Sequence, residues 1–249
     1  MPNLSTPSKI TWCPGCPNSQ ILVAFRKVIG DMITSNELKA ENIVCAAGIG
    51  CHGKISDYLN LNTFTALHGR PIPAMTGIKY ANPDLTVIGF SGDGDSFSEG
   101  LEHLVHAARK NVDIKLFVHD NQVFALTTGQ ATALSPKGFK GKSTPEGNPD
   151  EPFNSLSLVL AAGASFVART YAADIAGTER IMTAAIRHKG FAFVDIIQPC
   201  ITFFDTRDYF KDRVYWIDET RPKNDLNEAI RLVTAKDGRV PLGIFYERL

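Results

Sequence analysis

The sequence carries no net charge, because 26 lysine and arginine residues balance 26 aspartate and glutamate residues among 249. Without an excess of positive charge there is no global field to attract nucleic acid, and a hydrophobic content of 44% argues against disorder. No run approaches the roughly 18 apolar residues that a membrane helix needs, and the first residues lack the apolar core of a signal peptide. We therefore expect a cytoplasmic protein with a sizeable core that binds neither nucleic acid nor a membrane.

Cysteine is scarce, with five residues at positions 13, 16, 45, 51 and 200. An odd number without a secretory signal is poor evidence for a disulfide framework. Cys13 and Cys16 form a C-P-G-C turn, which directs two thiols toward one point. Taken alone, this spacing suits a structural zinc corner, a redox pair or half of an iron–sulfur site. The other three cysteines stand singly, so any four-thiolate site must combine distant parts of the chain.

Hydrophobic patterns predict alternating strands and helices along the chain. Helices are expected at 19–29, 73–80, 98–110, 156–162, 175–189 and 225–235, with Gly30 ending the first. Strands are expected at 42–47, 64–67, 84–90, 113–118, 165–171 and 191–197, with an edge strand at 241–246. A stretch of about thirty residues after Asn121 is rich in Gly, Pro, Ser and Lys and predicts a long loop.

This alternation is typical of an α/β fold, with a mostly parallel sheet and helices on both faces. The chain shows no internal repeat and no linker. We therefore predict a single domain over residues 1–249, with a cysteine-rich segment at about 10–18 and a C-terminal tail at about 205–249.

Polar or glycine-rich segments follow four of the predicted strands, at 48–51, 92–95, 120–121 and 200. Ligands of open α/β sheets bind beyond the carboxyl ends of the strands, where these segments meet. In Gly92-Asp93-Gly94-Asp95, the glycines allow backbone N–H groups to approach a phosphate, and a carboxylate suits Mg²⁺. Asn121 follows the next strand and is placed to complete the metal shell. The string alone also suits a tight turn, and the chain has no P-loop motif.

Further segments extend this pattern over about residues 10–205: Trp12-Cys-Pro-Gly-Cys16, Gly48-Ile-Gly-Cys51, Leu67-His-Gly-Arg70, Thr76-Gly-Ile-Lys79, Ala81-Asn-Pro-Asp84, His106-Ala-Ala-Arg109, Leu126-Thr-Thr-Gly-Gln130, Ile186 to Val194, and Gln198-Pro-Cys200. Together with the Gly-Asp-Gly element and Asn121, they resemble the β subunit of 2-oxoacid:ferredoxin oxidoreductases, which are thiamine diphosphate enzymes. The resemblance implies a thiamine diphosphate-binding (pyrophosphate-type) fold. The chain departs from the family pattern at Pro17, His52 and Phe124-Ala125.

The resemblance also implies a set of site residues. Mg²⁺ would be held by Asp93, Asn121 and the backbone carbonyl of Val123. One [4Fe–4S] cluster would be ligated by Cys13, Cys16, Cys51 and Cys200. Thiamine diphosphate would be bound by Gly50, Cys51, His68, Gly92, Asp93, Gly94, Asp95, Asn121, Val123, Leu126 and Thr127.

Two residues would act on the reaction itself. His68 would lie close to the diphosphate, and Lys54 would face the distal end of the substrate. A lysine there suits the second carboxylate of 2-oxoglutarate, although an ordinary surface lysine explains Lys54 as well. Cys45 matches no ligand position and is expected to be a buried small hydrophobic residue.

The implied activity is the coenzyme A-dependent oxidative decarboxylation of a 2-oxoacid, either 2-oxoglutarate or a pyruvate-like acid. Acyl-CoA and CO₂ would be the products, and electrons would pass through the cluster to ferredoxin. The family's cofactor-activating glutamate lies on a partner, so we expect activity only with an α (or fused γ/α) subunit.

Two alternatives remain open. A cluster-free thiamine diphosphate-dependent 2-oxoacid decarboxylase subunit would leave the four cysteines unexplained. A zinc-stabilised scaffold subunit without enzymatic activity would explain the cysteines but would reduce the Gly-Asp-Gly element to a turn.

Overall fold

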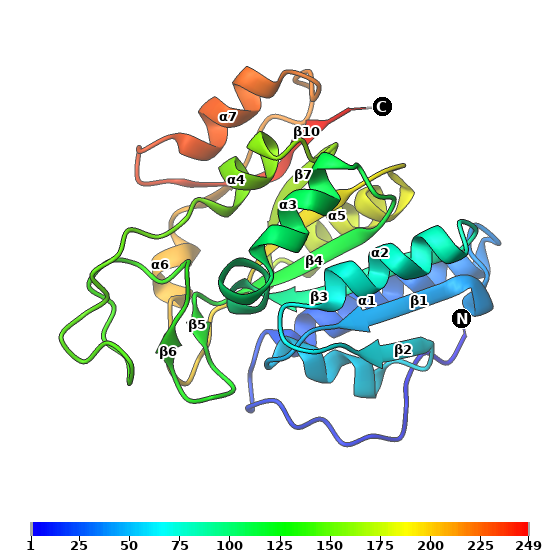
Figure 1. Cartoon of the computed structure of the whole chain (residues 1–249), viewed down its shortest axis with the longest axis horizontal. Coiled ribbons are helices and arrows are strands. Elements are labelled where there is room, and N and C mark those ends of the chain that lie inside the picture. The colour runs from blue at the N-terminus through cyan, green and yellow to red at the C-terminus, as the bar shows by residue number, and fades with distance from the viewer. Residues whose placement is uncertain (1, 249) are drawn as a thin grey trace.

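The computed structural model describes residues 2–248 and contains one eight-stranded sheet (Figure 1). Neighbouring strands are parallel except β7 and β10, which are antiparallel. The predicted mostly parallel α/β fold is therefore confirmed. The order across the sheet is β2 (Asn62–Thr65), β1 (Ile43–Ala47), β3 (Thr86–Gly92), β4 (Lys115–Asp120), β8 (Ala192–Ile197), β7 (Phe166–Tyr171), β10 (Val240–Glu247) and β9 (Val214–Trp216).

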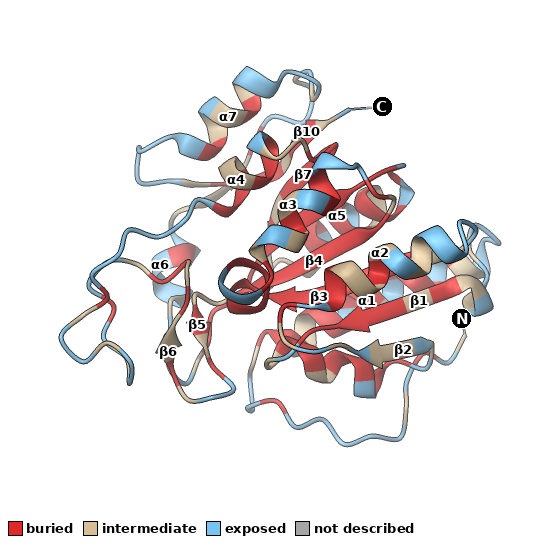
Figure 2. Cartoon of the chain, viewed as in Figure 1, coloured by how far each residue is buried: buried red, intermediate tan, exposed pale blue. Residues whose placement is uncertain are grey.

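Helices cover both faces of the sheet. α1 (Asn18–Thr34) and α5 (Ile175–Arg187) pack side by side on one face. The opposite face is covered by α2 (Pro71–Ala81), α3 (Leu101–Arg109), α4 (Ser155–Ala161) and α7 (Leu226–Thr234). Figure 2 shows the central strands buried between these layers, while the outer helix faces are exposed. No helix within residues 2–248 is both long and apolar enough to span a membrane.

Each helix packs through an apolar stripe at helical spacing. In α1, Ile21, Phe25, Val28 and Ile29 are buried, and the Phe25 ring packs edge-on against Phe90 of β3 with centroids 4.8 Å apart. α5 begins with an Asp174 side chain that accepts a hydrogen bond from the backbone of the first turn. The same periodicity that predicted the helices therefore also directs them onto the sheet.

Several predicted boundaries are wrong. Gly30 does not end the first helix, because Met32 and Ile33 continue its apolar stripe and α1 runs on to Thr34. The strand expected at 241–246 is not an edge, since β10 is covered by β9 in a parallel pair. The helix expected from 98 is divided into a π-helical turn, η3 (Gly94–Glu99), and α3.

Short elements account for further differences. The expected long loop contains a two-stranded hairpin, β5 (Val123–Phe124) and β6 (Gln130–Ala131). The expected C-terminal tail contains α6 (Arg207–Lys211) and contributes β9 and β10 to the main sheet. Two 3₁₀ helices, η1 (Ala40–Asn42) and η2 (His52–Tyr58), flank β1.

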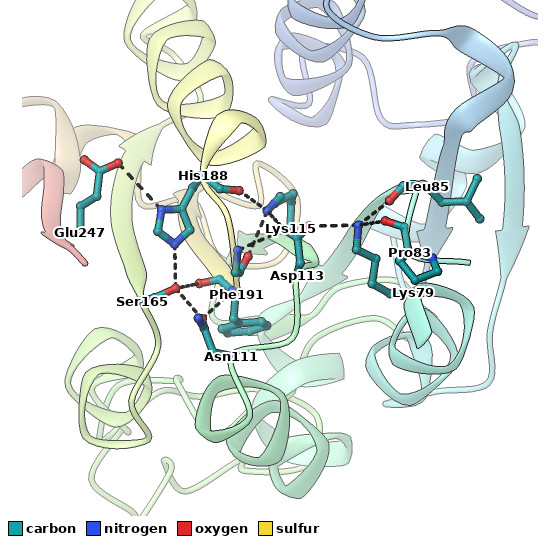
Figure 3. Close-up of polar contacts among 11 residues, drawn as sticks. Lys79, Pro83, Leu85, Asn111, Asp113, Lys115, Ser165, His188, Phe191 and Glu247 are labelled. Carbon is teal, nitrogen blue, oxygen red and sulfur yellow. Dashed lines mark hydrogen bonds and ion pairs between the residues drawn. The ribbon is translucent and has the colours of Figure 1, made fainter. Parts of the chain in front are cut away.

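A buried polar network lies at the edge of the sheet opposite the predicted ligand loops (Figure 3). The buried ammonium of Lys115 donates to the carboxylate of Asp113 at 2.5 Å and to the backbone carbonyls of His188 and Gly190. Lys79 also contacts Asp113, at 3.0 Å. Burial acts to raise the pKa of Asp113, but the bonds from both lysines hold it well below its usual value.

His188 is the titratable member of the network. Its Nε2 lies 2.7 Å from Ser165 Oγ, and its Nδ1 lies 3.9 Å from Glu247. Burial is the main cause that lowers the pKa of His188 to about 4, and the nearby charge of Lys115 adds to it. His188 is therefore neutral in the folded protein at pH 7.

We expect His188 to make stability depend on pH. An unfolded histidine has a pKa of about 6.5, whereas the pKa of His188 in the folded protein is about 4. Between these two pH values the unfolded chain binds a proton at this residue and the folded chain does not. Stability contributed by neutral His188 is present above pH 6.5 and is lost as the pH falls toward 4. Urea unfolding at pH 7 and pH 5 should show a loss for the wild type about 2 kcal/mol larger than for His188→Gln. The exposed His106→Gln should behave as the wild type, and equal losses in all three proteins would contradict this assignment.

Candidate active site

Two of the cavities at the carboxyl edge of the sheet contain the site residues predicted from the sequence. The first encloses about 440 Å³ and is formed by the loops that follow β1, β3 and β4 together with the β5–β6 hairpin. Every residue that was predicted to bind thiamine diphosphate lines it. We call it the diphosphate cavity, and its lining residues are Ile49, Gly50, Cys51, His52, His68, Gly92, Asp93, Gly94, Asp95, Asn121, Val123, Phe124, Ala125, Leu126 and Thr127.

Asp93 presents a buried carboxylate to this cavity. It follows β3 directly, and only 1% of its surface is exposed. Its Oδ2 accepts a hydrogen bond from Thr132 Oγ1 at 2.5 Å, and its Oδ1 accepts a longer one from the backbone N–H of Asn121 at 3.4 Å. Burial raises the pKa of Asp93 to about 7, although the bond from Thr132 opposes this. No lysine, arginine or histidine within residues 2–248 forms an ion pair with it.

Asn121 lies beside Asp93 and has a defined side-chain orientation. Its Nδ2 donates to Gln198 Oε1 at 3.3 Å, and its Oδ1 accepts from the backbone N–H of Val123 at 3.0 Å. The intervening residue, Gln122, adopts a left-handed conformation with φ 60° and turns the chain back toward the cavity. A carboxylate without a cationic partner and an oriented carboxamide oxygen are the hard donors that Mg²⁺ prefers, so these residues fit a magnesium ion.

Both carboxylate oxygens of Asp95 accept hydrogen bonds from other residues of the chain. Its Oδ1 accepts from the backbone N–H groups of Ile49 and Gly69 and lies 2.7 Å from His68 Nδ1, while its Oδ2 accepts from Ser91 Oγ at 2.7 Å. With both oxygens engaged, Asp95 holds the surrounding loops together. We therefore expect it to act on a diphosphate through the position of these loops.

Aromatic rings leave no space for a side chain at either glycine of the Gly-Asp-Gly element. A Cβ at Gly92 would lie 2.7 Å from the His52 ring, and one at Gly94 would lie 2.3 Å from the Phe124 ring. His52 and Phe124 are two of the positions at which the chain departs from the family pattern. His52 is buried, which lowers its pKa to about 4 and keeps it neutral beside the cavity.

The second cavity encloses about 420 Å³, and four of the five cysteines line it. We call it the cysteine cavity, and its lining residues are Thr11, Trp12, Cys13, Cys16, Asn18, Cys51, Lys54, Asn121, Ala125, Gln198, Cys200, Ile201, Thr202 and Phe203. Cys45 lies in the hydrophobic core instead, where burial raises its pKa to about 12. The division predicted from the sequence, with four cysteines together and one in the core, is the arrangement found.

Burial and nearby groups affect the ionisation of Cys16 and Cys51. Burial raises the pKa of Cys16, and the nearby Cys13 and Cys200 raise it further. The pKa of Cys51 is raised to about 11, mainly by burial, while Lys54 lowers it. Cysteine thiols lose their protons when they bind a metal or a cluster, and four thiols from three chain segments fit an iron–sulfur cluster. Within residues 2–248 no three His, Cys, Asp or Glu side chains are grouped to hold a single metal ion.

The two cavities share a wall. Cys51, Asn121 and Ala125 line both of them, so the same thiol and the same carboxamide border both cavities. Lys54 lies only on the cysteine side, where its ammonium donates to the backbone carbonyl of Thr11 at 3.1 Å. The partner roles of Thr132, Ser91 and Gln198 were not predicted from the sequence, and no motif marks the first two.

Comparison with protein families gives two adjoining matches. Residues 48–196 match the family "Thiamine pyrophosphate enzyme, C-terminal TPP binding domain", and residues 200–248 match the C-terminal family of the pyruvate ferredoxin oxidoreductase beta subunit. The first match contains every lining residue of the diphosphate cavity.

Individual proteins are similar over almost the whole chain. A 2-oxoacid:ferredoxin oxidoreductase subunit beta from a Sulfolobus species is 38% identical over 97% of this chain and 83% of its own. A 2-oxoglutarate synthase subunit from Archaeoglobus fulgidus is 38% identical over 77% of this chain and 70% of its own.

A solved structure is also similar, that of the 2-oxoglutarate:ferredoxin oxidoreductase from Magnetococcus marinus with 2-oxoglutarate, coenzyme A and succinyl-CoA bound. It is 32% identical, has a TM-score of 0.95, and the match covers 99% of this chain and 84% of that one. The chain therefore belongs to the family of 2-oxoacid:ferredoxin oxidoreductase β subunits.

Proposed function

We propose that this chain binds thiamine diphosphate, Mg²⁺ and one [4Fe–4S] cluster, and oxidises a 2-oxoacid together with an α subunit. The observation that carries the proposal is the shared wall, in which Cys51 and Asn121 face both the diphosphate cavity and the cysteine cavity. Electron transfer from a cofactor to a cluster is faster when the two sites lie close together, as these cavities do. A cluster-free decarboxylase subunit would have no use for the second cavity, and a zinc scaffold none for the first.

The residues of the chain have separate tasks in this proposal. Asp93, Asn121 and the carbonyl of Val123 hold Mg²⁺, and the Gly-Asp-Gly backbone with Leu126 and Thr127 holds the diphosphate. Bound thiamine diphosphate supplies the carbon nucleophile and the electron sink that decarboxylation of a 2-oxoacid requires. His68 lies against Asp95 through Nδ1 and lines the diphosphate cavity, so its other ring nitrogen is available to a diphosphate oxygen.

The four cysteines of the cysteine cavity hold the cluster, which accepts electrons one at a time and passes them to ferredoxin. Coenzyme A takes the acyl group as co-substrate. Lys54 lies beside the thiols and is bonded to Thr11, so its position gives no support to a bond with the second carboxylate of 2-oxoglutarate. The names of the relatives favour 2-oxoglutarate, and pyruvate-like acids are the second choice.

An α partner is supported by exposed apolar side chains around the diphosphate cavity. Ile49 is 38% exposed, Leu126 is 45% exposed, and Leu67, next to His68, is 79% exposed. Large apolar side chains around a polar site are typical of surfaces that a partner covers. We also propose that the chain is one domain, because β9 and β10 belong to the same sheet as the strands that form the site.

Anaerobic purification of the chain with its α partner tests the proposal. Iron, sulfide, zinc and thiamine diphosphate should be measured on one sample, and CoA-dependent ferredoxin reduction should be followed with 2-oxoglutarate, pyruvate and branched 2-oxoacids. Four irons and one thiamine diphosphate per chain are expected. Thiamine diphosphate without iron would favour the cluster-free decarboxylase, and zinc without thiamine diphosphate would favour the scaffold.

Asp93→Asn should abolish Mg²⁺-dependent cofactor binding. The substitution removes the charged ligand but keeps an acceptor for Thr132, and loss of a direct ligand should weaken affinity at least about 100-fold. Titration of thiamine diphosphate with and without Mg²⁺ measures this. The exposed Asp84→Asn is the matched control. Unchanged affinity in Asp93→Asn would show that the metal lies elsewhere.

Cys200→Ser should lose the intact cluster, because its thiol is one of the four in the cysteine cavity. Iron and sulfide contents and the absorbance near 400 nm should fall together. Cys45→Ala, which changes a core cysteine outside the cavity, should keep the wild-type iron content. Normal iron in Cys200→Ser would remove this residue from the ligand set.

A further inference from the structure

The side chain of Gln198 joins the two cavities directly. Gln198 follows β8, is 1% exposed, and is fixed by its backbone N–H, which donates to the carbonyl of Asp120 at 2.7 Å. Its carboxamide therefore has little freedom. One end of this carboxamide faces the proposed magnesium ligand Asn121, and the other faces the proposed cluster ligand Cys16.

Toward the metal site, Gln198 determines how Asn121 is turned. Gln198 Oε1 accepts from Asn121 Nδ2 at 3.3 Å, so the amide nitrogen of Asn121 is directed away from the metal and its oxygen toward Val123. Only the oxygen of a carboxamide is a ligand for Mg²⁺. Without the acceptor on Gln198, nothing among the described side chains holds Asn121 Nδ2 in place.

Toward the cluster, Gln198 offers a hydrogen-bond donor. Its Nε2 lies 3.8 Å from Cys16 Sγ and also donates to the carbonyl of Pro199 at 3.1 Å. Hydrogen bonds to ligand sulfur stabilise the reduced, more negative cluster and raise its reduction potential. Cys13 has a separate donor, the hydroxyl of Thr202 at 3.4 Å, which has no contact with Asn121.

We propose that Gln198 is a positioning residue that couples occupancy of the magnesium–diphosphate site to the reduction potential of the cluster. The inference rests on the proposed function. When Mg²⁺ fixes Asn121, Gln198 is fixed in turn, and its N–H is held toward Cys16. Coupling between two sites is reciprocal, so reduction of the cluster also strengthens binding of Mg²⁺ and thiamine diphosphate.

Two variants of Gln198 distinguish its contact with Asn121 from its contact with Cys16. Gln198→Met has a similar length but provides neither a donor to Cys16 nor an acceptor for Asn121. Gln198→Glu keeps the acceptor for Asn121 but replaces the donor with an oxygen near the thiolate. Thr202→Val is the matched control, because it removes a sulfur donor without touching the metal site.

The test uses the anaerobic complex with the α subunit and two measurements besides activity. The midpoint potential of the cluster is obtained by EPR-monitored titration with and without Mg²⁺ and thiamine diphosphate, and cofactor affinity is obtained by titration. In Gln198→Met, the equilibrium constant for reduction of the cluster should fall about tenfold, which lowers the midpoint potential by about 59 mV for one electron. Its cofactor affinity should fall about tenfold, as for other residues that orient a metal ligand.

The pattern across the variants decides the outcome. Gln198→Glu should lower the potential but keep the affinity for Mg²⁺ and thiamine diphosphate, and Thr202→Val should do the same. The shift in potential on cofactor binding should persist in Thr202→Val and disappear in both Gln198 variants. If Gln198→Met fails to load its cluster, Gln198→Glu carries the test.

Two different failures are distinguishable. A wild-type complex without iron or thiamine diphosphate would overturn the proposed function, and this inference with it. A fully loaded complex in which the Gln198 variants keep the wild-type potential, affinity and cofactor-induced shift would overturn this inference alone.

Discussion

One buried carboxylate, that of Asp95, holds together the loops from which the site is built. It is 2% exposed and accepts hydrogen bonds from two backbone N–H groups and from Ser91 Oγ, and His68 Nδ1 lies 2.7 Å away. Hydrogen bonds to a charged group contribute roughly 1.5–3 kcal/mol each, and an unmade one costs at least as much. The loops after β1, β2 and β3 are therefore fixed relative to one another. The positions of Asp93 and Cys51 both depend on this one side chain.

The sheet could be predicted because its central strands are apolar runs that end in Gly, Asp, Asn or Cys. Short elements could not be predicted in this way. β9 has three residues and no periodicity, so the sequence pattern alone makes β10 an edge strand. Gly30 resembles a helix end, but burial of Ile29 and Met32 outweighs its cost of about 1 kcal/mol within a helix.

The chemical types of the site residues were also visible in the sequence, whereas their partners were not. Thr132 and Gln198 contact Asp93 and Asn121 from 39 and 77 positions away, and such pairings depend on the path of the chain through the sheet. The packing of His52 against Gly92 was missed for the same reason. Loop motifs thus predict which polar side chains reach the site, and the fold decides which partner each of them contacts.

The cysteine cavity is built from both ends of the chain, and this has a consequence for how the protein is made. The thiols at positions 13 and 16 leave the ribosome early, but Cys200 and Gln198 follow only when most of the polypeptide has been synthesised. Until then the C-P-G-C turn has no opposing wall, and its thiols are open to oxidation or to each other. The cysteine cavity is therefore incomplete in the nascent chain. A cluster held as proposed would be assembled only after Cys200 has been synthesised, and the two early thiols would need a reducing environment until then.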